Sequence, residues 1–184
     1  MIIASQKRKE NIAEYLLYMW QVEDLIRANN LDIEKIKTNI IDRYQLSDDQ
    51  RKQMTEWYES LIDMMRREGI EHKGHLQLTR NVISQLAALH QTLLKDPEFQ
   101  EYTALFYKTL PYIVELRSKA GDDRQGELET CFTALYGVLM LRLQGKEISP
   151  GTQDAIREIS RFIATLSHYF KLDDDDKLFN KDEK

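Results

Sequence analysis

The chain has 184 residues and a formal net charge of −5 at pH 7, and it contains only seven Gly and three Pro. This shortage of chain-breaking residues excludes a turn-rich all-β sandwich and favours long helices. The hydrophobic fraction of 42% can supply a core, so the chain is not disordered as a whole, and its length is that of one domain.

The N-terminal half of the chain carries three amphipathic patterns of helical period. The first predicts a helix over residues 5–27. A short second helix follows Asp32, which serves as its N-cap. The third helix begins at Ser47, where Gln50 three residues later completes a capping-box pattern, and it ends at Gly69.

Four further helices are predicted in the C-terminal half. The fourth begins near Gly74, and the fifth begins at Asp96–Glu98, where a cap residue, a proline and an acid follow one another. Pro111 should kink or split this fifth helix. The sixth helix, Glu127–Leu143, is apolar on most sides, which predicts a buried central helix. Ser149–Pro150 opens the seventh.

Together these patterns predict an all-α fold in which amphipathic helices bury their stripes against one another. We expect a single-domain bundle or array of about seven helices over residues 1–172, with a kink near Pro111 and a loop over residues 121–126. Residues 173–184, which begin with four adjacent Asp, are expected to form an acidic, charged tail.

Three polar residues fall on or beside these apolar stripes and are candidates for buried polar groups. At about 100° per residue, Glu23 lies within about 20° of Ile12 on the first helix. His90 and Arg142 lie among apolar residues of the fourth and sixth helices. An unpaired buried charge costs several kcal/mol, so we expect Glu23 to pair with Arg142 or His90. Such a pair would line a ligand pocket or fix the helix register, unless Arg142 reaches water.

Two aromatic residues on the first helix, Tyr18 and Trp20, flank its apolar stripe on opposite sides. One of them is therefore expected to contact a further element. That element could be another helix of the core or a partner subunit, because aromatic residues are enriched at interfaces.

The sequence offers little local chemistry. Cys131 is the only cysteine and lies in an apolar run, so it reads as a small buried hydrophobe. His72 and His75 have a ligand-like spacing, but Gly74 interrupts them and no second pair completes a metal site. Phosphate loops, nucleophile elbows and paired cysteines do not occur, and we expect no cofactor and no metal.

The charge balance and hydropathy also limit the partners. The one basic cluster, Lys7–Lys9, is too small to favour nucleic-acid binding in an acidic chain. No stretch approaches the roughly 20 apolar residues of a membrane span, and no secretory signal is visible. These features predict a cytoplasmic protein that binds neither nucleic acid nor membrane.

The opening of the chain carries three short runs, Ile2–Lys7, Glu10–Tyr15 and Tyr18–Asp24. With these runs the chain resembles a bacterial family known only as a domain of unknown function, family 4924, whose members are about this long. The resemblance implies an all-helical fold and a small cytoplasmic protein of Bacteroidetes. It assigns no activity and no catalytic residue.

Aromatic-flanked amphipathic helices without chemical motifs favour a noncatalytic interaction or scaffold protein that self-associates, so a homo-oligomer is expected. Two alternatives stay open. One is a small-ligand-binding bundle with a polar pocket near Glu23, His90 and Arg142. The other is an enzyme whose site is dispersed over distant helices.

Overall fold

The computed structural model describes residues 2–120, 125–175 and 177–178, and it confirms the all-α prediction. These residues form eight α-helices and two short 3-10 helices, and they contain no strand. The elements are α1 (Ile2–Glu10), α2 (Ile12–Ala28), α3 (Ile33–Asn39), η1 (Ile41–Arg43), α4 (Asp48–Arg67), α5 (Gln77–Lys95), η2 (Pro97–Phe99), α6 (Gln100–Ala120), α7 (Glu127–Leu143) and α8 (Pro150–Asp174).

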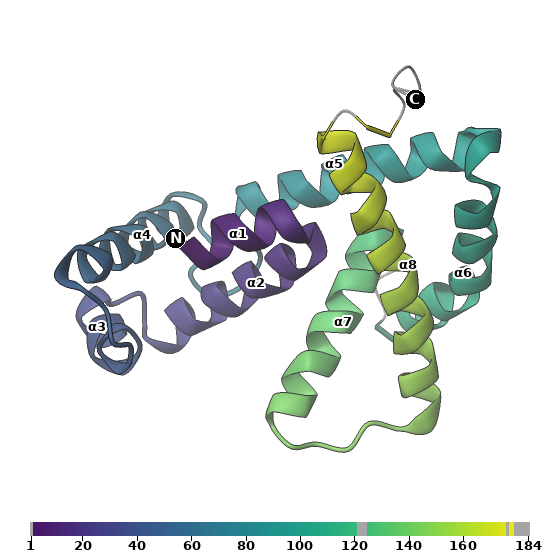
Figure 1. Ribbon diagram of the computed structural model, residues 1–184. Helices are drawn as coiled ribbons and strands as arrows, with labels where there is room; N and C mark the ends of the chain where they lie inside the picture. The colour runs from purple at the N-terminus through teal and green to yellow at the C-terminus, as the bar shows by residue number, and fades with distance from the viewer. Residues whose placement is uncertain (1, 121–124, 176, 179–184) are drawn as a thin grey trace.

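Helices α1 to α4 lie at one end of the molecule and α6 to α8 at the other, and α5 runs alongside both groups (Figure 1). One cluster of buried apolar residues continues through both ends. Its largest fully buried side chains include Trp20, Tyr102, Phe132 and Phe162. None of the helices in the described residues is both long and apolar enough to cross a bilayer.

The prediction of one helix over residues 5–27 is wrong, because the chain breaks at Asn11. The Asn11 backbone is extended, with φ −154° and ψ 105°, and its side chain accepts hydrogen bonds from the amides of Ala13 and Glu14. Asn11 is therefore an N-cap of α2. The break lets α1 fold back and pack on α2.

The start signals predicted for α3 and α4 are confirmed. The Asp32 side chain caps α3, and Ser47 and Gln50 form the reciprocal capping box of α4. Gly69, just after the end of α4, has the left-handed φ of 66° that only glycine adopts without strain.

Helix α5 begins at Gln77, three residues after the predicted start. Gly74 has a φ of 93°, and His75 and Leu76 follow it in nonhelical conformation. These residues are held by contacts to α2, described below. Helix α5 itself contacts α2, α6, α7 and α8, so it connects the two ends of the molecule.

Helix α6 runs through Pro111 without interruption, so the split that proline could cause does not occur. Pro111 and Tyr107 both lie on the exposed side of the helix. The carbonyl of Tyr107, four residues before the proline, loses its donor where water can replace it.

The bounds predicted for α7 are confirmed, but its predicted central position is wrong. Only five of its residues, from Leu128 to Val138, are buried, and Leu143 at its end is 70% exposed. The apolar content of α7 exceeds what its neighbours α2, α5, α6 and α8 cover.

Helix α8 ends at Asp174, two residues inside the predicted tail. Residues 176 and 179–184 of that tail, and 121–124 of the predicted loop, lie outside the described residues.

Candidate functional site

Glu23 is the most completely buried charged side chain of the sequence-predicted candidates, with 0% exposure. Its Oε2 lies 2.7 Å from His75 Nδ1, and its Oε1 accepts a hydrogen bond of 3.1 Å from the Leu76 amide. Thr79 Oγ1 lies 3.5 Å from the same oxygen and donates more closely to the Leu76 carbonyl, at 2.8 Å. The carboxylate of α2 thus sits at the N-terminus of α5, where backbone amides and the helix dipole favour negative charge.

The partners of Glu23 therefore differ from those predicted. The sequence pattern placed Glu23 on the buried face correctly, but its carboxylate binds the segment before α5 rather than His90 or Arg142. Arg142 lies on the exposed side of α7 near its C-terminus, where its guanidinium reaches water. Glu23 and Arg142 therefore lie in different surroundings, and the ligand pocket predicted near these three residues stays a prediction.

Trp20 stabilises the same junction. Its indole stacks on the imidazole of His75 with ring centroids 3.9 Å apart and planes 13° apart, and it meets Phe132 and Tyr136 edge-on. Trp20 is only 2% exposed, so the idea that it contacts a partner subunit is replaced by a contact inside the chain. His75 is 32% exposed, and its ring closes the junction on the solvent side.

Two further side chains, Arg27 and Tyr136, stabilise the residues around this junction. The Arg27 guanidinium donates to the carbonyls of Ile70 and Gly74 and pairs with Asp24. The Tyr136 hydroxyl of α7 donates to Asp24 at 2.6 Å. A carboxylate–imidazole pair can support general base chemistry. Here both carboxylate oxygens of Glu23 bind the residues at the start of α5. The Glu23–His75 pair therefore stabilises the fold.

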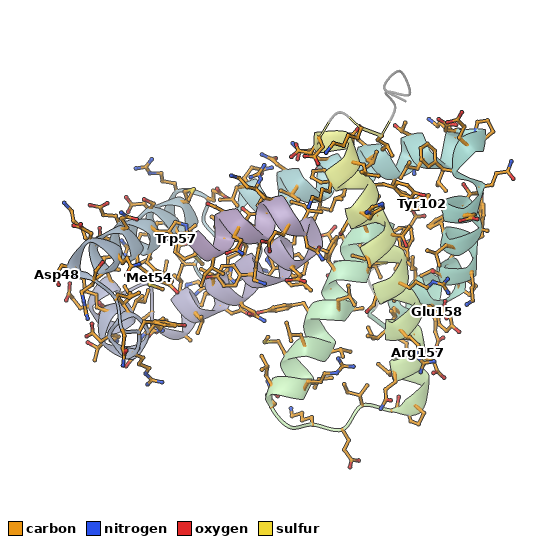
Figure 2. The ribbon with its side chains drawn as sticks, viewed as in Figure 1. Asp48, Met54, Trp57, Tyr102, Arg157 and Glu158 are labelled. Atoms are coloured by element: carbon orange, nitrogen blue, oxygen red, sulfur yellow. The ribbon has the colours of Figure 1, made fainter. Side chains whose placement is uncertain are left out.

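His90 forms a separate buried contact with Tyr102 of α6. His90 Nδ1 lies 2.6 Å from the Tyr102 hydroxyl, and the rings of Phe106 and Phe162 meet the imidazole edge-on. Figure 2 shows Tyr102 between α6 and α8, and its ring lies 5.7 Å from that of Phe162. Burial lowers the pKa of His90 to about 4 and raises that of Tyr102, so both side chains are neutral at pH 7.

Tyr18, the second aromatic interface candidate, is half-buried beside a small hollow at the α1–α4 end. The hollow has a volume of about 230 Å³ and mainly apolar walls, to which Ile3, Tyr44, Leu46 and Met54 contribute. Figure 2 marks Met54 and Trp57 on α4.

Cys131 is buried, as predicted, and burial raises the pKa of its thiol to about 12, which leaves it unreactive.

One exposed strip of α6 was not among the residues predicted from the sequence. The inward side of the helix carries Tyr102, Phe106, Thr109 and Ile113, all buried. A strip centred on Tyr107, which we call the α6 outer face, consists of Gln100, Thr103, Ala104, Tyr107, Leu110, Pro111, Val114 and Ser118, of which Thr103 and Leu110 are half-buried. Tyr107 is 62% exposed and Val114 54% exposed, although both are large and apolar. A second apolar spacing, at positions 107, 110, 111 and 114, was the signal that could have revealed it.

Within the described residues, no group of three or more His, Cys, Asp or Glu side chains is placed to hold a metal ion.

The model of one family, described as Domain of unknown function (DUF4924), matches residues 1–177 of the chain. Comparison with curated proteins and with solved structures gives no match.

We expect Glu23→Gln to lower the free energy of unfolding by about 1.5–3 kcal/mol, because a charged acceptor of buried hydrogen bonds is replaced by a neutral amide. Chemical denaturation at pH 7 measures the change. Glu14→Gln on the same helix is the matched control. Glu14 is exposed and pairs with Lys7 on the surface, so this variant should lower the free energy of unfolding by less than about 1 kcal/mol. Equal stability of the Glu23 variant and the parent would contradict the buried-anchor assignment.

The depressed pKa of His90 predicts a loss of stability in acid. Between pH 6.5 and about 4, His90 is protonated in the unfolded chain but not in the folded one, so the free energy of unfolding falls as the pH drops through this window. The contribution reaches about 3 kcal/mol below pH 4.

Denaturation of the parent and of a His90→Phe, Tyr102→Phe double variant at pH 7 and pH 4.5 separates this contribution from that of the carboxylates. The parent should lose more stability than the double variant over the same interval. Identical losses in the two proteins would show that His90 is not held neutral.

Proposed function

The chain belongs to the DUF4924 family, and we propose that it is a noncatalytic interaction protein that self-associates through the α6 outer face. The proposed compartment is the cytoplasm, and the single cysteine, which is buried and unpaired, supports it. The observation that carries the proposal is an uncharged, partly apolar strip on a solvent-facing helix.

The α6 outer face is uncharged over its whole length, from Gln100 to Ser118. At a rise of about 1.5 Å per residue this strip is about 27 Å long. Its eight residues project within about 60° of the direction of Tyr107. In a chain with 31% charged residues, a strip of five helical turns around Tyr107 without a charge is unusual, and the exposed charges of α6 lie along one edge of it.

Helix α8 provides the comparison within the same molecule. It also buries one side against the core, but its exposed charges Asp154, Arg157 and Arg161 lie within the exposed strip, whereas those of α6 lie along one edge of the Tyr107 strip. The arrangement on α8 is typical of a helix whose outer side faces only water. The α6 outer face instead resembles the centre of an interface, where charged residues are depleted and tyrosine is enriched.

A second copy of the chain fits this strip better than a bilayer or a nucleic acid. The strip lacks the Lys and Arg that would contact phosphate groups. A two-fold pair buries the same face of both copies and needs no second surface. We therefore expect reversible dimers whose population rises with concentration.

Sedimentation or light scattering over a concentration series tests the proposal. The parent should pass from the 21.8 kDa monomer towards twice that mass as its concentration rises. A Tyr107→Glu, Val114→Glu double variant should associate roughly 100-fold more weakly or not at all, because each copy would bury unpaired charges.

Leu143→Glu is the matched control, since Leu143 is exposed and apolar but lies at the end of α7. It should associate as the parent does. Circular dichroism establishes that both variants keep their helices. A parent that stays monomeric at every concentration, or an α6 variant that associates like the parent, would contradict the proposal.

A further inference from the structure

Resting on the proposed function, we infer that two copies pair through α6 in antiparallel orientation, about a two-fold axis that passes between Leu110 and Pro111. Tyr107 of one copy then lies level with Val114 of the other. The charged residues along one edge of the α6 outer face carry this inference.

That edge carries Glu101, Lys108, Glu115 and Lys119, all exposed and about 80–120° from Tyr107 around the helix. Their signs alternate in chain order. When two helices pack antiparallel, each edge meets the same edge of the other helix in reverse order. Acid, base, acid, base on one copy therefore faces base, acid, base, acid on the other, and opposite charges meet throughout.

The parallel arrangement lacks this complementarity. There the charged edge of one helix would meet the opposite edge of the other, on which Arg117 is the one charged residue within α6. Three of the four charges would then face no opposite charge across the pair. The antiparallel arrangement is favoured because it gives each of them a partner.

The axis position follows from the spacing of the same residues. An axis between Leu110 and Pro111 sets Tyr107 level with Val114 and Thr103 level with Ser118 of the other copy. It also sets Glu101 within one residue of the level of Lys119. At that axis position Lys108 lies within two residues of the level of Glu115, which is about 3 Å along the helix.

The shape of the outer face agrees with this register. Tyr107 projects between two shallow hollows, one lined by Leu94, Pro97 and Thr103 and the other by Leu110, Pro111 and Val114. In the two-fold pair the Tyr107 ring of each copy enters the second hollow of the other. Such a contact is self-complementary, as a two-fold interface requires.

The charged edge is already held in place within each copy. Lys108 Nζ lies 2.9 Å from Glu158, which is labelled on α8 in Figure 2, and Lys119 Nζ lies 2.6 Å from Glu115. These pairs keep the long side chains beside the strip rather than across it. A partner copy would extend them into a row of alternating charges.

Cysteine cross-linking separates the two orientations. Thr103→Cys and Ser118→Cys are prepared as two single variants and treated with a short bis-maleimide, separately and as an equal mixture. In the antiparallel pair, positions 103 and 118 are about 8–10 Å apart, whereas position 103 lies about 22 Å from its own counterpart. The mixture should therefore give at least about tenfold more covalent dimer than either variant alone.

The parent chain is the control, because Cys131 is buried and should not react. Covalent dimer in each single variant, with none added by mixing, would overturn the antiparallel inference but leave self-association standing. Monomers in the sizing experiment would overturn both.

A charge exchange gives a second test that does not depend on cross-linking. Glu101→Lys and Lys119→Glu should each weaken association several-fold, and the double variant should restore it, because the two residues face each other across the pair. If the double variant associates no more strongly than the single variants, the proposed register of the two α6 helices is overturned.

Discussion

The hydrogen bond between His90 and Tyr102 fixes how α6 is turned about its own axis. The His90 imidazole and the Tyr102 hydroxyl are both buried and lie 2.6 Å apart. They can bond to each other only when this side of α6 packs against α5. Turning the helix would leave a phenol and an imidazole unsatisfied, at a cost of about 1–3 kcal/mol each. The side of α6 opposite Tyr102 therefore faces outward, and that side carries Tyr107 and Val114.

Helix α5 receives polar anchors near both of its ends. Glu23 of α2 binds the residues at its start, and His90, five residues before its end, binds α6. Each anchor joins α5 to a different end of the molecule, as the path of α5 in Figure 1 shows. Buried polar contacts of this kind specify which faces meet, whereas apolar stripes alone would tolerate sliding and rotation.

The sequence predicted helices where local chemistry marks them, as at Ser47, Asp32 and Ser149. It missed the break at Asn11 because the polar run of residues 5–11 contains no Gly or Pro to mark a helix end, although Glu14 three residues later resembles a capping pattern. Periodicity placed Glu23 on the buried face but could not name its partner, because His75 lies 52 residues away in a nonhelical segment. It also misjudged α7, since apolar content does not say how many neighbours will cover a helix.

Exposure of the Tyr107 ring tests the account most directly, because it depends on both the fixed turn of α6 and the proposed pairing. Hydroxyl-radical footprinting of the unmodified chain over a dilution series measures it, with Tyr44, 52% exposed at the other end of the molecule, as the internal reference. The account predicts that labelling of Tyr107 falls relative to Tyr44 as the concentration rises. A constant ratio up to millimolar concentration would contradict the pairing, and a Tyr107 that resists labelling even at the highest dilution would contradict the turn of α6.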